Sequence, residues 1–318
     1  MADPGRRPSV SIVVPCYRSA ASLPQLVARL EPVLHDCADR FEIVLVVDGS
    51  PDDTWSVASK LADDHAFVVA LRLSRNYGQH QALLAGVREA RHDVVVTMDD
   101  DLQHRPEAVP TLLDALGPAV DLVYGVSLAE EHGPFRNMTS RALKSLLGRT
   151  LGVPHAQSFS AFRAFRARLR AGFADVSGPA TSLDVLLSWT TARVTEVEVP
   201  MDQRAHGRSN YSLRMLMAHA LTMVLGYSTA PLRAATYLGL ALGLVGLGLM
   251  GYVLVSFLAG DVGVPGFTMI ASMVAMFSAA QLVSLGLLGE YLGRVHGHSI
   301  GRPSYLVADR SDRSDRTA

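Results

Sequence analysis

Three consecutive aspartates are the residues of this chain best suited to chemistry. Asp99, Asp100 and Asp101 come directly after 94–98, whose β-branched residues predict a buried strand. Two unit charges about 4 Å apart repel by about 4 kcal/mol at an effective dielectric constant of about 20, so such a cluster either stays solvated or surrounds a cation. Ligands of open α/β sheets bind at the carboxyl ends of the strands. We therefore predict a divalent-cation site that meets a phosphate-bearing substrate.

The alternation of side chains along an extended chain places Asp99 and Asp101 on one side and Asp100 on the other. With the amide of Gln103 nearby and no His or Cys cluster, this oxygen-only set suits Mg²⁺ or Mn²⁺ far better than zinc. The alternative is a solvated turn that caps a helix beginning near Pro106, since proline is common in the first turn of helices.

The elements that must position these aspartates are predicted by the alternation of β-branched runs and helical patterns over residues 10–125. This rhythm predicts a doubly wound α/β domain with a mostly parallel sheet. Its strands are expected at 11–14, 42–47, 68–73, 93–98 and 121–124. Polar, turn-rich sequence follows several strand ends, where a nucleotide would lie. No GxGxxG or GxxxxGKS/T loop occurs, so neither a dinucleotide fold nor a P-loop is indicated.

Long apolar runs occupy the last third of the 318-residue chain, and no charged residue occurs in 234–259 or 262–289. Each run exceeds the roughly 20 residues that cross a bilayer. We therefore predict a transmembrane hairpin with spans at about 234–259 and 265–289. The alternative, two buried core helices of a soluble protein, is disfavoured by the length of the runs.

The charges that flank these runs predict their orientation. Arg233 precedes the first run, Arg294 and Arg302 follow the second, and the connecting loop has no Lys or Arg. The positive-inside rule places both ends in the cytoplasm. We expect an integral protein of the plasma or inner membrane, with a cytoplasmic catalytic domain and tail. No signal peptide is evident, and Cys16 and Cys37 lack metal-site spacing, so both are expected to be reduced thiols.

Two further segments predict helices near the membrane. In 139–151 the leucines share one face and the basic residues the other, as in an interfacial helix or, equally, in a helix packed on a core. The segment 212–225 is apolar all round and leads toward the first span. The formal net charge of −1 excludes no class of partner, and no basic stripe indicates nucleic acid, so we expect no nucleic-acid partner.

Three regions follow from these patterns. We expect a catalytic domain with its interfacial helices at 8–228, a transmembrane hairpin at 229–297 and a cytoplasmic tail at 298–318. The tail repeats Asp-Arg-Ser from Asp309 onward, and its low complexity and balanced charge predict disorder.

Short motifs occur in order along nearly the whole chain. They lie at 12–17, 47–52, 74–78, 98–107, 203–211, 231–233, 289–294 and 302–305. Together they resemble the family-2 glycosyltransferases of GT-A fold, and within these the polyprenyl-phosphate glycosyltransferases similar to dolichyl-phosphate mannose synthase and the undecaprenyl-phosphate sugar transferases. The resemblance implies a nucleotide-sugar donor, a polyprenyl phosphate acceptor, Mg²⁺ or Mn²⁺ as cofactor, and a place in cell-envelope glycan biosynthesis.

On the donor side, the resemblance assigns the roles of the family's residues to the matching positions of this chain. It implies that Pro15, Tyr17 and Asp48 form part of the nucleoside pocket and that Asp100 lies in the donor site. The metal and diphosphate would be bound by Asp99, Asp101 and Gln103.

On the acceptor side, the resemblance implies that Arg136, Ser140 and Arg141 grip the phosphate of the lipid. Arg204, expected to be catalytic, and Ser209, expected to bind the donor, match a loop that closes over the donor and acceptor phosphates. Two arginines can hold a phosphate bidentately.

Asp184 lies in the region where soluble relatives keep a catalytic acid, and the alternative is a carboxylate stabilised at a helix N-terminus. The chain departs from the family pattern at three positions, Val47, Ser127 and Asn210. Val47 replaces the first of two aspartates before Gly-Ser. Ser127 replaces an arginine after the fifth strand, and Asn210 replaces a lysine of the closing loop.

The mechanism expected is inverting transfer in which a metal stabilises the departing diphosphate. An acceptor phosphate is already anionic, so no strong general base is required, and His104 is expected to make polar contacts only. A processive polysaccharide synthase is a second reading, but it would show a Gln-x-x-Arg-Trp motif and more spans. A third is a catalytically idle membrane scaffold. The sugar, the polyprenol and the oligomeric state stay open, although glycines in the first span would permit a homo-oligomer.

Overall fold

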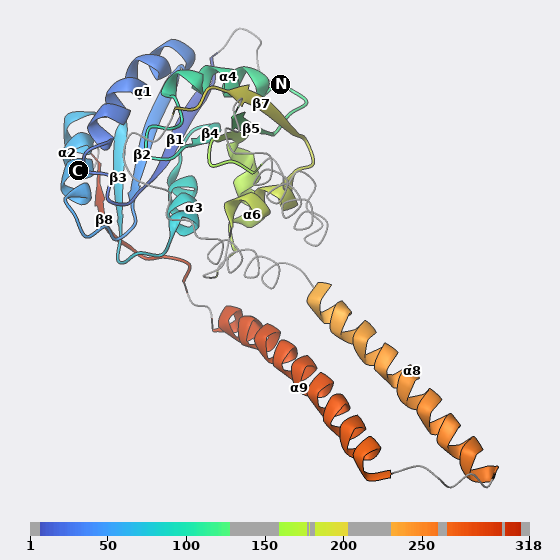
Figure 1. The fold of residues 1–318 in the computed structure, drawn as a ribbon. Coiled ribbons are helices and arrows are strands. Elements are labelled where there is room, and N and C mark those ends of the chain that lie inside the picture. The colour runs from blue at the N-terminus through green and yellow to red at the C-terminus, as the bar shows by residue number, and fades with distance from the viewer. Residues whose placement is uncertain are drawn as a thin grey trace. The chain divides into compact units, whose positions relative to one another are not determined.

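The computed structural model describes residues 7–127, 159–176, 178, 182–202, 230–259, 266–300 and 303–312 (Figure 1). The chain divides into two compact units, one of residues 1–149, 153–210 and 301–318 and one of residues 150–152 and 211–300. The predicted domain boundary at residue 228 lies outside the described residues.

The first unit is built on a mixed sheet whose described strands follow the order β7-β5-β6-β4-β1-β2-β3-β8. The strands are β1 (Ser9–Cys16), β2 (Arg40–Val47), β3 (Val68–Leu73), β4 (Val94–Thr97), β5 (Leu122–Ser127), β6 (Arg163–Arg166), β7 (Val194–Val199) and β8 (Val307–Ser311). β1 pairs in parallel with β2 and β4, β2 with β3, and β5 with β7, whereas β6 and β8 pair antiparallel to their neighbours. The predicted mostly parallel α/β fold is confirmed, with all five expected strands.

Helices cover both faces of this sheet. They are α1 (Leu23–Cys37), α2 (Thr54–Asp64), α3 (Gln79–Glu89), α4 (Val109–Ala115), α6 (Leu183–Thr190) and the 3₁₀ helices η1 (Pro106–Ala108) and η2 (Ala167–Phe173). In β1, Ile12 and Val14 pack with residues of α1, α2 and α4, while Val13 packs with residues of α3 and α6. Because both faces are covered, the central strands are apolar at successive positions rather than alternating.

The tail forms a strand that the sequence did not predict. We expected disorder from Asp309, but β8 pairs antiparallel with β3, with Ser311 opposite Ala70 and Arg310 opposite Leu71. β3 would otherwise present unpaired backbone groups at the edge of the sheet. The expectation is therefore wrong for the described part of the tail. The composition of the tail does not report that β3 has an unpaired edge with which the tail can form hydrogen bonds.

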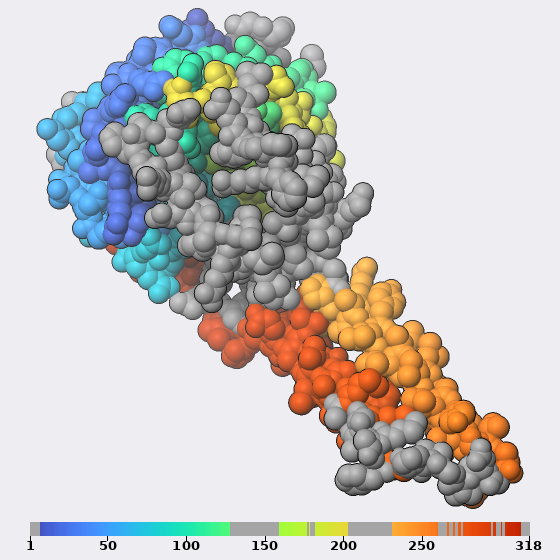
Figure 2. All heavy atoms as spheres, viewed as in Figure 1, coloured from blue at the N-terminus to red at the C-terminus, as the bar shows by residue number. Residues whose placement is uncertain are grey.

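The second unit contains the helices α8 (Ala230–Leu258) and α9 (Gly266–Ser299), which pack against each other (Figure 2). In the described residues, one helix segment, Pro231–Leu258, is long and apolar enough to cross a membrane, and its apolar side chains are uncovered. It matches the first predicted span to within one residue at its end. The second predicted span falls largely within α9 and stays a prediction.

Candidate functional site

A polar pocket of about 300 Å³ opens in the first unit where β1, β2 and β4 end. Parallel strands bring their carboxyl ends to the same edge of a sheet, so segments far apart in sequence meet there. The residues that line the pocket are Pro15, Cys16, Tyr17, Asp48, Asn76, Gly78, Gln79, Asp99, Asp100 and Asp101. Of the predicted donor-side residues that the structure describes, all except Gln103 thus share one cavity.

Asp100 ties the acidic segment to the end of β1. Its Oδ2 accepts hydrogen bonds from the backbone N–H of Tyr17 (3.2 Å) and from the hydroxyl of Ser19. Burial raises the pKa of Asp100 to about 6, despite these hydrogen bonds and with support from the neighbouring carboxylates. Asp100 therefore serves to hold the chain in place, and it points to partners different from those of its neighbours, as the alternation predicts.

Asp99 and Asp101 are held by amide groups. Gln79 Nε2 donates to Asp99 Oδ1 over 2.6 Å, and the backbone N–H of Gln103 donates to Asp101 Oδ1 over 3.1 Å. Within the described residues no three His, Cys, Asp or Glu side chains gather as a ready metal cage. Two carboxylates at an open pocket nonetheless fit Mg²⁺ or Mn²⁺, since Mg²⁺ commonly takes one or two carboxylates and completes its shell with water and phosphate oxygens.

His104 supports the acidic segment through the backbone of Asp99. Its Nδ1 accepts a hydrogen bond from the backbone N–H of Asp99 (3.1 Å), and its ring stacks on Phe162 with centroids 5.1 Å apart. Burial lowers the pKa of His104 to about 4, so the imidazole is neutral near pH 7 and can accept this bond. The predicted polar contact is confirmed.

Asp48 holds a loop that forms one wall of the pocket. Its two carboxylate oxygens accept hydrogen bonds from the backbone N–H groups of Tyr77 and Gly78, each over 2.7 Å. Burial raises the pKa of Asp48, and the two amide bonds oppose this. A direct contact between Asp48 and a nucleoside stays a prediction.

Asp184 lies apart from the lining of this pocket. It is buried in the first turn of α6, where Arg163 Nη1 donates to its Oδ1 and Tyr124 Oη lies 3.3 Å from the same atom. Arg163 Nε also donates to Thr97 Oγ1 (3.0 Å) at the end of β4. The structure therefore places Asp184 in a buried ion pair at a helix N-terminus, and its catalytic role stays a prediction.

The residues predicted to hold the acceptor phosphate and to form the closing loop lie outside the described residues. They are Arg136, Ser140, Arg141, Arg204 and Ser209. The same holds for Asn210 and for the predicted helices at 139–151 and 212–225.

The sequence reasoning missed three polar residues of the site, Ser19, Asn76 and Gln79. Asn76 lies within the motif at 74–78 and Gln79 follows it directly, and this motif by itself indicates the family resemblance and no particular contact. These three residues reach the site through contacts between segments that are distant in sequence. A local sequence pattern does not reveal such contacts.

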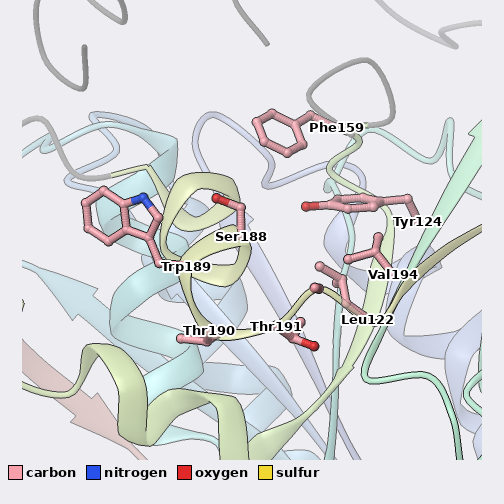
Figure 3. Close-up of a pocket in the computed structure, with 9 residues that line it drawn as sticks. Leu122, Tyr124, Phe159, Ser188, Trp189, Thr190, Thr191 and Val194 are labelled. Carbon is pink, nitrogen blue, oxygen red and sulfur yellow. The ribbon is translucent and has the colours of Figure 1, made fainter. Parts of the chain in front are cut away.

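A second cavity, of about 410 Å³, lies between β5, α6 and β7 (Figure 3). Among the described residues that line it none is charged, and they include Tyr124, Phe159 and Trp189. Such a lining is poorly suited to a diphosphate, because it offers neither a cation nor ligands for one. The smaller, acidic pocket is therefore the candidate active site.

Comparison with known proteins decides the family. The model of glycosyl transferase family 2 matches residues 11–175. The chain belongs to glycosyl transferase family 2. This match includes every residue that lines the acidic pocket, whereas α6, β7 and β8 lie beyond it. The chain is accordingly a glycosyltransferase.

Relatives within the family resemble almost the whole chain. An undecaprenyl-phosphate 4-deoxy-4-formamido-L-arabinose transferase of Pseudomonas aeruginosa is 34% identical over 301 residues, covering 94% of this chain and 89% of the relative. An enzyme of the same name from Sodalis glossinidius is 33% identical over 310 residues, covering 96% and 95%.

Solved structures share the GT-A fold. Mannosyl-3-phosphoglycerate synthase from Rubrobacter xylanophilus matches with a TM-score of 0.51 at 18% identity, covering 68% of this chain and 72% of that one. Glucosyl-3-phosphoglycerate synthase from Mycobacterium tuberculosis, crystallised with Mn²⁺, UDP-glucose and phosphoglyceric acid, matches with a TM-score of 0.50 at 23% identity, covering 70% and 78%. At these identities the likeness concerns the fold alone.

Proposed function

We propose that this chain moves a sugar from a nucleotide-sugar donor to polyprenyl phosphate, with inversion and with a divalent cation, on the cytoplasmic face of a membrane. One observation carries the proposal. Pro15, Tyr17, Asp48 and the three aspartates at 99–101 come from three separate stretches of chain and line one pocket at the carboxyl ends of β1, β2 and β4. The names of the relatives support undecaprenyl phosphate as the acceptor.

The chemistry proposed for the donor side rests on the two carboxylates held by amides. Asp99 and Asp101, with Gln103, would hold Mg²⁺ or Mn²⁺ against the donor diphosphate. When bound, the cation supplies charge stabilisation for the departing nucleotide. Gln79 keeps Asp99 oriented, and Asp100 keeps the segment attached to β1, so little reorganisation is needed during the reaction.

The chemistry proposed for the acceptor side needs no strong base, because a phosphate monoester is already anionic at neutral pH. Arg136 and Arg141 would position that phosphate, with Ser140, for in-line attack on the anomeric carbon. Arg204 and Ser209 would close over both phosphates. We also propose a catalytic role for Asp184, whose carboxylate pairs with Arg163.

Membrane attachment fits this acceptor, since the phosphate of a polyprenyl lipid lies at the bilayer surface. The apolar side chains of α8 are uncovered in the described residues, and lipid would cover them. Arg233 near the start of α8 supports a cytoplasmic location for the catalytic unit.

The test incubates membranes that contain the full chain with Mn²⁺, undecaprenyl phosphate and labelled nucleotide sugars. The panel includes the activated form of 4-deoxy-4-formamido-L-arabinose, because the relatives carry that name. Label should enter the chloroform-extractable fraction, and Asp101→Asn should lower the rate by roughly 100-fold or more. The matched control is Asp114→Asn, which removes the charge of an exposed aspartate on α4 and should leave the rate unchanged.

Two results would contradict the proposal. Label in high-mass polymer would favour a processive synthase. No transfer from any donor of the panel would favour an idle scaffold.

A further inference from the structure

The residues at 303–312, here called the tail brace, follow α9 in the chain and return to the sheet of the first unit. Within the tail brace, β8 covers the edge of β3, and its charged side chains have partners on other elements. Arg310 pairs with Glu89 (2.5 Å) at the end of α3, and the buried carboxylate of Asp312 accepts from Arg91 (3.2 Å). The tail brace is therefore anchored by specific contacts as well as by strand pairing.

The tail brace also reaches the wall of the acidic pocket. The segment 74–79, here called the donor loop, follows β3 directly. The carbonyl of Leu306 accepts a hydrogen bond from the backbone N–H of Ser74 over 2.9 Å. The rings of Tyr77 and Tyr305 pack against the same apolar cluster. The first residue of the donor loop is thus fixed by the tail.

The rest of the donor loop connects this contact to the acidic segment. The hydroxyls of Ser74 and Tyr77 lie 2.9 Å apart, Asp48 accepts from the N–H groups of Tyr77 and Gly78, and Gln79 donates to Asp99. The loop is held from β2 on one side and from the tail on the other. A displacement of Ser74 would therefore also change the position of Asp99.

A buried hydroxyl gives the tail brace a second contact, with Gly178. Ser304 Oγ accepts a hydrogen bond from the backbone N–H of Gly178 over 2.9 Å, and the carbonyl of Gly178 accepts from Gln81 Nε2 over 3.3 Å. Ser304 is 5% exposed. Since Gln81 lies in the first turn of α3, this chain of contacts supports the helix that begins directly at the donor loop.

We propose that the tail brace is a positioning element of the nucleotide-sugar site: by fixing the donor loop it sets the affinity for the donor. This inference rests on the proposed function, because it takes the acidic pocket as the donor site. The tail brace touches no substrate in this scheme. Its loss should therefore raise the donor KM much more than it lowers kcat.

The test compares four variants of the full chain in detergent. Arg310→Glu sets like charges against Glu89 and Asp312, and Ser304→Ala removes the buried acceptor at Gly178. Arg310→Lys keeps the positive charge and should behave like the parent. The fourth variant, Lys60→Glu, makes the same change of charge as Arg310→Glu at an exposed site on α2.

Two measurements distinguish an effect of the tail brace on donor binding from an effect on the chemical step. Hydrogen exchange of the donor loop amides should become faster in Arg310→Glu and Ser304→Ala and stay unchanged in the other two variants. Titration with a nucleoside diphosphate and Mn²⁺ should show binding about five- to tenfold weaker in the first two variants, as expected for losing roughly one hydrogen bond's contribution. The donor KM should rise by the same factor, with kcat changed less than about twofold.

Several outcomes would overturn the inference. The first is unchanged exchange of the donor loop when the amides of β8 have become fast. The second is a looser donor loop with unchanged nucleotide affinity. If the parent chain binds no nucleotide at all, the proposed function fails, and this result is distinct because it does not depend on any tail variant.

Discussion

Gly49 and Asp48 form a tight corner at the end of β2, and this corner shapes the donor side of the pocket. Gly49 has a φ of +55°, a conformation that residues with a Cβ rarely adopt. A Cβ at this position would lie 2.2 Å from the backbone carbon of Arg75. The donor loop can approach β2 this closely only because residue 49 lacks a side chain, and the approach lets Asp48 reach two amides of the loop.

The first prediction concerns Gly49→Ala. The strained φ alone should cost about 1–3 kcal/mol of unfolding free energy, and the collision with Arg75 should push the donor loop away. We expect weaker binding of a nucleoside diphosphate with Mn²⁺ and faster hydrogen exchange at Tyr77 and Gly78. Gly117→Ala is the matched control, because a Cβ there meets nothing within 4 Å. Equal behaviour of the two variants would contradict this account of the corner.

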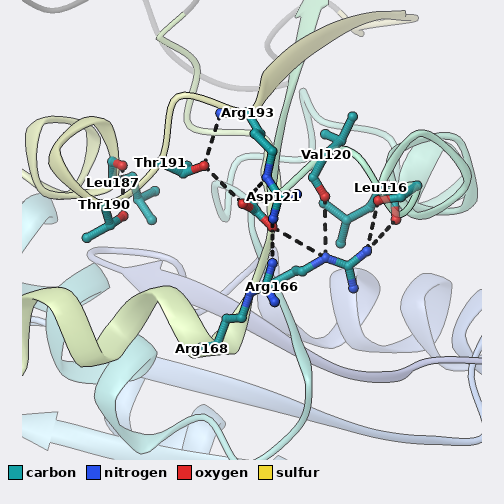
Figure 4. Close-up of polar contacts among 10 residues, drawn as sticks. Leu116, Val120, Asp121, Arg166, Arg168, Leu187, Thr190, Thr191 and Arg193 are labelled. Carbon is teal, nitrogen blue, oxygen red and sulfur yellow. Dashed lines mark hydrogen bonds and ion pairs between the residues drawn. The ribbon is translucent and has the colours of Figure 1, made fainter. Parts of the chain in front are cut away.

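At the scale of elements, one carboxylate joins the strands at the far end of the sheet. Asp121 precedes β5 and is 6% exposed by side chain, and it accepts from Arg168 (2.6 Å), Arg193 (2.9 Å) and Thr191 (3.0 Å) (Figure 4). Arg166, at the end of β6, lies 3.6 Å away. These partners come from β6, from η2 and from the segment before β7, so Asp121 fastens β7 to the part of the sheet that precedes it in sequence.

The second prediction concerns Asp121→Asn, which leaves several guanidinium groups without their common anion. Arg168 and Arg193 are 61% and 50% exposed, so solvent screens part of the loss. We expect a decrease in unfolding free energy of about 1–3 kcal/mol. Urea unfolding of the full chain in detergent measures it, with Trp189 of neighbouring α6 as the fluorescent probe. A loss below a few tenths of a kcal/mol would contradict the fastening role.

The same carboxylate predicts a dependence on pH. Burial by itself would raise the pKa of Asp121, but hydrogen bonds from Arg168, Arg193 and Thr191 outweigh it, and the pKa lies below its usual range. The folded state therefore binds the proton less readily than the unfolded state, whose pKa is about 3.9. The stability that ionised Asp121 contributes is therefore complete above the unfolded pKa and is lost as the pH falls through the folded pKa. The difference in unfolding free energy between the parent and Asp121→Asn should therefore be complete at pH 6. It should disappear as the pH falls below the folded pKa of Asp121.

At the scale of the whole molecule, α8 presents a long apolar surface that the described residues leave uncovered. Leu244 and Leu247, near the middle of this helix, are 62% and 60% exposed. Uncovered apolar area of this extent in one helix is stable only in lipid or against another protein. Lipid is the surrounding that the acceptor of the proposed reaction also requires.

The third prediction tests the span and its orientation together. A cysteine in place of Asp261, in the connection between the two helices, should react with an impermeant maleimide added to intact cells. Leu244→Arg combined with Leu247→Arg should abolish this labelling, since each arginine at mid-helix costs about 2.5–3.5 kcal/mol of insertion free energy. The same two positions changed to Phe should leave it intact. Labelling only after cell lysis would contradict the predicted orientation.

The sequence by itself determined the features that local patterns report. The five expected strands have clear β-branched runs, and parallel strands must bring their carboxyl ends together, so Pro15, Tyr17, Asp48 and Asp99 could be expected in one pocket. The apolar composition of α8 likewise needs no partner to be recognised. In each case the pattern extends over enough residues to be distinguished from the irregular sequence of a loop.

Only the tertiary structure decided the features that depend on distant partners. β8 is short and highly charged, and it becomes a strand because β3 offers a free edge and because Arg310 meets Glu89, 221 residues earlier in the chain. The pairing of the Asp184 carboxylate with Arg163 in the interior was likewise not evident from the sequence, and the catalytic role of Asp184 stays a prediction. Such contacts depend on which elements become neighbours in space, and composition and spacing along the chain do not specify that.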